Sequence, residues 1–168
     1  SNLSFPIPDD ESISVFDCLN LLSKPEKLDD YKCESCGNTQ CNFLEKRMIT
    51  TPKVLILHLK RFESDMFGRL SKKNNKVDYP LILNLNDYCL GNMNRNTGHN
   101  FSLFTVICHS GILSGGHYIS YTRRLIKDNN EKISYTPWFK CNDETITKVD
   151  ESEVINHGLA YILFYHKI

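Results

Sequence analysis

The run Val54-Leu55-Ile56-Leu57-His58-Leu59 limits the possible folds of this chain more than any other segment does. It is almost wholly apolar, and it is bounded by Pro52 on one side and by Lys60-Arg61 on the other. A short, continuous apolar run of this kind is typical of a strand that is buried on both faces. We therefore expect this strand to lie inside a sheet that other elements cover.

The rest of the pattern predicts one short helix and several more strands. Apolar residues recur at helical spacing over residues 14–23, and Ser14 with Asp17 three residues later resembles a capping box. A helix that leads into a largely antiparallel sheet is an α+β pattern. We expect further strands at 81–85, 101–109, 116–124, 133–141 and 159–166, and loops at 91–99 and 127–132.

Composition and charge exclude several classes of protein. The 168 residues suit one ordinary domain or a large piece of one. Lysine plus arginine and aspartate plus glutamate are balanced at 20 each, so no overall field recruits nucleic acid or an anionic membrane. No apolar run approaches the roughly 18 residues of a membrane-crossing helix, and residues 1–4 show no signal-peptide pattern. We expect neither a nucleic-acid partner nor a membrane.

The cysteines favour free thiols and one candidate metal site. Seven is an odd number, and most of the cysteines are scattered, which indicates a reducing compartment, the cytoplasm or the nucleus. Cys33 and Cys36, followed by Gly37, form a C-x-x-C knuckle whose thiolates can both reach one zinc ion. A structural site needs four ligands, and Cys41 is a candidate for a third. Half of a zinc ribbon is the interpretation that we favour, and a metal-free knuckle and a redox pair stay open.

Two glycines stand immediately before a histidine in Gly115-Gly116-His117-Tyr118. Because glycine has no side chain, this sequence lets a substrate backbone come close to the imidazole. A histidine by itself is more often structural than catalytic. A second residue is needed to support a catalytic role for His117.

That second residue is Asn142, in the stretch Trp138-Phe139-Lys140-Cys141-Asn142-Asp143. A hairpin with a two-residue turn at 129–130 would place His117 opposite Asn142 and Tyr121 opposite Trp138. Opposed side chains on antiparallel strands share a face, with their Cβ atoms roughly 5 Å apart. The Asn142 carbonyl would then accept the imidazole N–H and fix its tautomer, as in Cys-His-Asn peptidases.

Several motifs resemble, in order, those of the ubiquitin-specific proteases. The histidine box of that family is similar to residues 115–118 followed by Tyr121, and the box of its third catalytic residue resembles 138–143 followed by Ile146 and Val149. Residues 52–62, PKVLILHLKRF, and 160–165, AYILFY, resemble two of its strands. The similarity runs from about Phe5 to His166, nearly the whole chain.

The resemblance implies a papain-like cysteine peptidase of the ubiquitin-specific protease type, in which thumb, palm and fingers grip ubiquitin. Residues 1–168 would be the C-terminal part of one catalytic domain, with 24–50 in the fingers and 51–168 in the palm. Nothing in the chain resembles the N-terminal box that carries the family's nucleophilic cysteine. We therefore expect the thumb to be absent from this chain and the chain alone to be inactive.

The resemblance also assigns roles to residues of the site. His117 would be the general base, Asn142 its orienting partner where many members have Asp, and Asp143 an auxiliary polar residue near the oxyanion. Catalysis would need no cofactor, and Cys33 and Cys36 would supply half of a structural zinc site. The expected partners are ubiquitin or a ubiquitinated protein and the N-terminal half of the same domain. The residues expected to contact substrate are Gly115, Gly116 and Tyr118.

Two classes of function follow. The leading one is hydrolysis of the isopeptide or peptide bond after the C-terminal Gly-Gly of ubiquitin. The alternative is a catalytically inactive module that binds ubiquitin or serves as a scaffold. The presence of both His117 and Asn142 favours the enzyme. An independent zinc-ribbon interaction domain would leave the strand-rich remainder of the chain unexplained.

Overall fold

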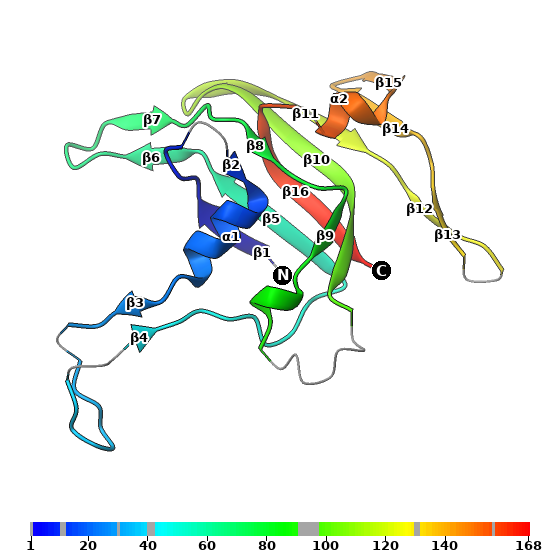
Figure 1. The fold of residues 1–168 in the computed structure, drawn as a ribbon. Helices are drawn as coiled ribbons and strands as arrows, with labels where there is room; N and C mark the ends of the chain where they lie inside the picture. Colours follow the sequence, from blue (N-terminus) through cyan, green and yellow to red (C-terminus); the bar gives the residue numbers. More distant parts are fainter. Residues whose placement is uncertain are drawn as a thin grey trace.

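The computed structural model of the chain describes residues 2–10, 13–29, 31–39, 43–90, 98–129, 132–155 and 157–168. Its centre is an eight-stranded sheet in the order β1-β5-β16-β10-β11-β14-β15, with β9 also paired to β10 (Figure 1). Among the described strands of this sheet, only the β1–β5 pair is parallel, so the predicted α+β fold with a mostly antiparallel sheet is confirmed. The strands are β1 (Asn2–Pro6), β5 (Val54–Lys60), β9 (Ile82–Asn84), β10 (Asn100–Ile112), β11 (Gly115–Thr122), β14 (Trp138–Asn142), β15 (Thr145–Val149) and β16 (Ala160–Lys167).

The apolar run forms β5, which lies between β1 and β16 as an inner strand. Leu55, Leu57 and Leu59 are at most 2% exposed, whereas Ile56 and His58 are only half-buried. Successive side chains of a strand point to opposite faces of the sheet. The prediction of burial on both faces is therefore wrong within the described residues, because the core gathers on the face of the three leucines.

Helix α1 (Val15–Ser23) begins where the sequence predicts it. The Ser14 side chain accepts a hydrogen bond from the Asp17 backbone N–H, and the Asp17 carboxylate accepts one from the Ser14 N–H, which confirms the capping box. The helix buries Val15, Cys18 and Leu19 in the core. Burial raises the pKa of the Cys18 thiol to about 11, as expected for a packed, unreactive cysteine.

Arg61, directly after β5, ties two loops to the sheet although it is only 1% exposed. Its guanidinium donates to the carbonyls of Ala160 at 2.7 Å, Asn75 at 2.8 Å, Lys73 at 3.0 Å and Gly158 at 3.2 Å. Backbone carbonyls therefore satisfy this buried cation. The contacts join the segment around residues 73–75 to the start of β16.

No helix within the described ranges is long and apolar enough to cross a membrane.

Four short pairs of strands extend from the main sheet. The β3–β4 pair lies to one side of the sheet (Figure 1), and we name the surrounding residues 24–50 the arm; its assignment to the fingers stays a prediction. The pairs are β2 (Ile13–Ser14) with β8 (Val77–Asp78), β3 (Glu26–Lys27) with β4 (Phe43–Leu44), β6 (Phe62–Ser64) with β7 (Leu70–Lys72), and β12 (Leu125–Lys127) with β13 (Ile133–Tyr135). The helical segments after β9 are a 3-10 helix (Asn86–Tyr88) and α2 (Glu151–Ile155).

Most predicted strands are found within a few residues of their expected bounds. Those at 81–85, 101–109, 116–124 and 159–166 correspond to β9, β10, β11 and β16. The segment at 133–141 instead forms two strands, β13 and β14, separated at Pro137, which has no N–H for the ladder. Of the loop predicted at 91–99, residues 91–97 lie outside the described part of the chain.

The hairpin before β14 has a longer loop than predicted. The predicted turn at 129–130 would pair Lys127 with Lys132, but the β12–β13 ladder pairs Lys127 with Ile133, so the predicted register is wrong. Asn130 and Glu131 lie outside the described residues. The β12–β13 register differs from the predicted one by one residue, and the β11–β14 register differs by two, so the break between the two pairs adds a second residue to the shift. Tyr121 lies opposite Lys140 rather than opposite Trp138.

Candidate active site

His117 and Asn142 lie on the neighbouring antiparallel strands β11 and β14, and their side chains meet. The Nε2 atom of His117 is 2.5 Å from the Oδ1 atom of Asn142. The predicted contact between these two residues is therefore confirmed, whereas their catalytic roles stay predictions.

Strand alternation explains why the pair meets in spite of the wrong register. His117 and Tyr121 point to the same face of β11, because they are four residues apart. Tyr121 lies opposite Lys140, and Asn142 is two residues beyond Lys140 on β14, so Asn142 shares that face. The ladder ends at Ser120–Cys141. A register error of two residues kept every side chain on its predicted face, and the two side chains meet beyond the last ladder pair.

The contact determines which nitrogen of the neutral imidazole carries the hydrogen. An amide oxygen only accepts hydrogen bonds, so the Nε2 atom of His117 carries the hydrogen that the Oδ1 atom of Asn142 accepts. In the neutral ring, Nδ1 is then the nitrogen with a free lone pair. The His117 side chain is 49% exposed, so the ring is accessible from solvent. The geometry suits a proton acceptor whose tautomer is held by Asn142.

Asp143 follows Asn142 in the turn between β14 and β15. It has φ of 49°, a left-handed conformation that Asp tolerates better than most residues. Its Oδ2 atom is 3.9 Å from the Nε2 atom of His117, and its side chain is 78% exposed. At this distance and exposure the carboxylate stabilises an imidazolium only weakly.

The two glycines before His117 meet different surroundings. A Cβ atom on Gly116 would lie 2.2 Å from the Nε2 atom of His109 and 2.4 Å from the Ser110 carbonyl oxygen. A Cβ atom on Gly115 would meet nothing within 4 Å. Gly116 is therefore required by packing within the chain, which the sequence pattern did not reveal. Gly115 faces open space, and its contact with substrate stays a prediction.

Tyr118 points to the opposite face of β11 from His117, because successive strand residues alternate. Its ring centroid is 4.5 Å from that of His109, which is 3% exposed. Burial lowers the pKa of His109, so this buried imidazole is held neutral. The structure therefore does not bring Tyr118 together with the His117–Asn142 pair, and its contact with substrate stays a prediction.

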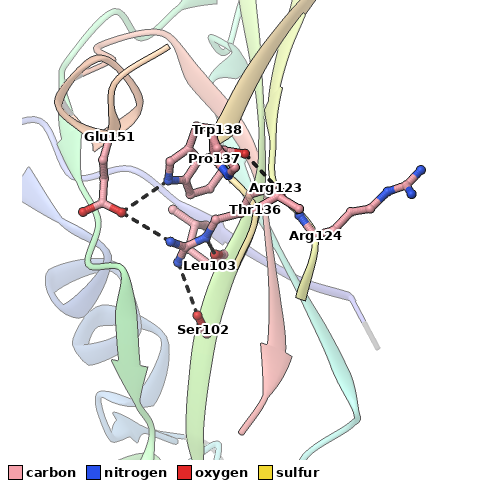
Figure 2. Close-up of polar contacts among 8 residues, drawn as sticks. All are labelled: Ser102, Leu103, Arg123, Arg124, Thr136, Pro137, Trp138 and Glu151. Carbon is pink, nitrogen blue, oxygen red and sulfur yellow. Dashed lines mark hydrogen bonds and ion pairs between the residues drawn. The ribbon is translucent and has the colours of Figure 1, made fainter. Parts of the chain in front are cut away.

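A second layer of side chains supports the strands that carry the pair. The Arg123 guanidinium lies 4.1 Å from the Tyr135 ring centroid and 4.6 Å from that of Trp138. It also donates to the Leu103 carbonyl at 3.0 Å and to the Glu151 carboxylate at 3.3 Å (Figure 2). Glu151 lies on α2 and accepts the Trp138 indole N–H at 3.3 Å as well. One carboxylate thus joins α2 to the ends of both β11 and β14.

The same short helix contacts these strands through a second carboxylate. Glu153 accepts the Tyr121 hydroxyl at 2.9 Å and a hydrogen bond from Lys140 at 3.3 Å. The Tyr121 hydroxyl lowers the pKa of Glu153, so the carboxylate stays charged. We name β11, β14 and α2 the braced edge. The acidic stretch at 150–153 was a signal for these contacts that sequence reasoning did not use.

None of the described cysteines is placed to act on a substrate bound at His117. Cys18, Cys89 and Cys108 are buried, and burial raises the pKa of Cys108 to about 12. Cys141 points to the opposite face of β14 from Asn142, because the two residues are adjacent on the strand. Cys33 and Cys36 lie between β3 and β4 in the arm, and the β3–β4 pair lies far from β14 (Figure 1).

The Cys33–Cys36 knuckle fits half of a zinc site. Gly37 has φ of 69°, and its N–H donates to the Cys33 carbonyl at 2.8 Å, so the chain turns tightly behind the two thiols. Hydrogen bonds from the backbone N–H groups of Cys36 and Ser35 lower the pKa of Cys33, which favours the thiolate that zinc binds. The described residues contain no group of three or more candidate metal ligands. Cys41, the candidate third ligand, lies outside them.

Comparison with known proteins shows the family of this chain. The sequence profile described as ubiquitin carboxyl-terminal hydrolase matches residues 24–165. The chain belongs to this family. The ubiquitin carboxyl-terminal hydrolase 8 of Saccharomyces cerevisiae is 31% identical over 173 residues, which cover 98% of this chain and 34% of that protein. The human ubiquitin carboxyl-terminal hydrolase 19 is 34% identical over 89% of this chain and 12% of its own length.

Solved structures of ubiquitin hydrolases share this fold. The SAGA DUB module of Ubp8, Sgf11, Sus1 and Sgf73 bound to monoubiquitin matches with a TM-score of 0.82 and 30% identity. That match covers 99% of this chain and 35% of the chain in the complex. The same module bound to ubiquitin aldehyde also gives a TM-score of 0.82, at 29% identity over 99% of this chain and 36% of that one. The chain thus spans only 12% to 36% of the length of these relatives.

Proposed function

We propose that this chain supplies the histidine and asparagine of a cysteine-type deubiquitinase. The observation that carries the proposal is the 2.5 Å contact between the Nε2 atom of His117 and the Oδ1 atom of Asn142, in a chain of the ubiquitin carboxyl-terminal hydrolase family. The substrate is a protein or peptide joined to the C-terminal Gly-Gly of ubiquitin. The nucleophile is a cysteine outside this chain, in the N-terminal half of the same catalytic domain.

The reaction proceeds in two stages. The Nδ1 atom of His117 accepts the thiol proton, and the thiolate attacks the carbonyl carbon of the terminal glycine. The C–N bond breaks, the leaving amine takes the proton from the imidazolium, and a thioester joins ubiquitin to the enzyme. Water then attacks the thioester carbon while the Nδ1 atom accepts its proton, the C–S bond breaks, and the imidazolium returns the proton to the thiolate. The products are the free ubiquitin carboxylate and the regenerated thiol.

Asn142 contributes to this reaction by holding the imidazole in place. Its side chain is neutral, so it fixes the tautomer and the ring plane without adding a negative charge beside the imidazolium. Asp143 is the auxiliary polar residue, and Gly115, Gly116 and Tyr118 contact the substrate tail. Catalysis needs no cofactor. Cys33 and Cys36 would hold one side of a structural zinc ion in the fingers, with the remaining ligands from elsewhere in the domain.

The test measures hydrolysis of a fluorogenic ubiquitin C-terminal amide by the full-length protein. His117→Ala is expected to reduce kcat by about 10²–10⁴-fold, because general acid–base catalysis contributes on this order. Asn142→Ala is expected to reduce kcat less and to leave the affinity for ubiquitin largely intact, because the binding surface remains. The 168-residue chain alone is expected to be inactive.

Three outcomes would contradict the proposal. Full turnover by His117→Ala would remove the histidine from the mechanism. Turnover by the isolated chain, with one of its own cysteines labelled by a ubiquitin electrophile, would place the nucleophile within it. Ubiquitin binding without any turnover by the full-length protein would support the alternative, an inactive ubiquitin-binding module.

A further inference from the structure

The turn between β10 and β11 is held from outside by a lysine of a neighbouring hairpin. Lys72, the last residue of β7, donates from its Nζ atom to the His109 carbonyl at 2.9 Å and to the Gly111 carbonyl at 3.0 Å. Both carbonyls belong to the end of β10, just before the chain reverses into β11. The β6–β7 and β10–β11 hairpins are therefore joined at this point.

The tied segment is the one that places His117. Gly111 lies directly opposite Gly116, and Ser110 lies directly opposite His117. Gly111 has φ of 106°, and a Cβ atom there would lie 2.7 Å from the Gly115 carbonyl oxygen. The two strands thus approach closely at the turn, so a movement of the Gly111 carbonyl is passed on to His117 through the neighbouring ladder pairs.

Lys72 is unusual among the lysines near this hairpin. No carboxylate of the described residues lies within ion-pair distance of its Nζ atom. The Phe62 ring centroid is 5.8 Å away, and desolvation lowers the pKa of Lys72. A half-buried ammonium without a counter-ion costs free energy unless its N–H groups are satisfied. Here the carbonyls of His109 and Gly111 accept hydrogen bonds from the ammonium group.

The next residue, Lys73, gives the contrast. Its Nζ atom forms ion pairs with Asp9 at 2.7 Å and with Glu63 at 3.2 Å, and it donates to the Ile7 carbonyl at 2.8 Å. These contacts tie the β6–β7 hairpin to the N-terminal segment. None of them involves the β10–β11 turn, so two adjacent lysines hold two different parts of the chain.

We propose that Lys72 is a positioning residue for His117. By holding the carbonyls of His109 and Gly111, it keeps the β10–β11 turn, and with it the imidazole, in the geometry that reaches Asn142. This inference rests on the proposed function of His117 as the general base. Lys72 acts through the backbone of the turn, not on the reacting atoms.

The kinetic test uses the full-length protein and the fluorogenic ubiquitin amide. Lys72→Met keeps the apolar stem but removes the donors, and kcat is expected to fall about ten- to a hundredfold, because a misplacement of about 1 Å costs on this order. KM is expected to stay within about twofold, since substrate contacts remain. Lys72→Arg, which keeps N–H donors, is expected to recover most of kcat. Lys73→Met, the matched control, is expected to keep kcat within about twofold.

A second measurement does not depend on activity. In ¹H–¹⁵N spectra of the histidine rings, the wild-type protein is expected to show a hydrogen-bonded Nε2–H signal for His117. Lys72→Met is expected to broaden or abolish this signal, and Lys73→Met is expected to retain it. If the wild-type protein does not cleave the amide, the proposed function fails, and this spectrum still tests the role of Lys72.

The inference is overturned by any of three results. The first is a His117 signal that is unchanged in Lys72→Met. The second is a loss in Lys72→Met that appears in KM alone, which would place Lys72 at the substrate. The third is an equal loss of kcat in Lys73→Met, which would indicate a general effect of the β6–β7 hairpin on the fold.

Discussion

The braced edge and the arm of this molecule are held together in different ways. At the braced edge, Arg123, Trp138 and Glu151 form one network of hydrogen bonds and ring contacts, and Arg123 is only 9% exposed. In the arm, β3 and β4 pair over two residues each. The Phe43 and Leu44 side chains of β4 are 62% and 44% exposed. One region is fixed by packing and the other by a few local backbone bonds.

The difference follows from the role of each region under the proposed function: the braced edge positions the general base, and the arm carries the knuckle. A general base must be held within about 0.5 Å of its productive position, and strands with a packed second layer provide that. The knuckle in the arm is held by the bond from the Cys33 N–H to the Asn38 carbonyl at 2.9 Å and by the turn at Gly37. A metal ion can supply the remaining order, because metal binding is coupled to folding.

The largest change in stability is expected when Arg123, the central residue of the braced edge, is replaced. Arg123→Met is expected to lower the free energy of unfolding by about 2–4 kcal/mol, because the Leu103 carbonyl loses a charged donor and Glu151 loses its cation. Arg124→Met is the matched control, since the Arg124 side chain points away from the network (Figure 2) and its loss is expected to cost less than about 0.5 kcal/mol. Urea unfolding measures both, and equal losses would contradict the assignment of the brace.

A smaller effect is expected at the two glycines before His117. Gly116→Ala is expected to cost about 1–3 kcal/mol, because the new methyl group would overlap the His109 ring and the Ser110 carbonyl. Gly115→Ala has open space and is expected to change stability by less than about 0.5 kcal/mol. If Gly115 admits the substrate tail, Gly115→Ala should still raise KM. A stable Gly116→Ala variant would show that the β10–β11 turn adapts more easily than its contacts indicate.

The smallest effect on stability is expected in the arm. Cys33→Ser and Cys36→Ser are expected to change the free energy of unfolding of the 168-residue chain by less than about 0.5 kcal/mol, because both residues lie away from the core. The chain is also expected to bind zinc weakly, since two missing ligands forfeit most of the binding free energy. Stoichiometric, chelator-resistant zinc in the purified chain would show that the ligand set is larger than Cys33 and Cys36.

Local patterns in the sequence were sufficient for α1, for the position of β5 and for the face shared by the pair at the site. The capping box of α1 joins residues three apart, and β5 follows from one apolar run, so neither depends on distant parts of the chain. The face shared by His117 and Asn142 also follows from a short-range rule, because strand alternation has a period of two. Any even error in register leaves that face unchanged.

Only the tertiary structure decided the register, the burial and the supporting contacts. The register depends on the loop at 128–132 and on the break at Pro137. The periodicity of the sequence does not predict their combined effect on the register. Glycine is required at position 116 because the His109 ring lies across the hairpin from it. Lys72 reaches the carbonyls of His109 and Gly111 over sequence separations of 37 and 39 residues. Contacts of this kind arise only when the sheet order brings the hairpins together, so residue type and spacing along the chain carry no signal for them.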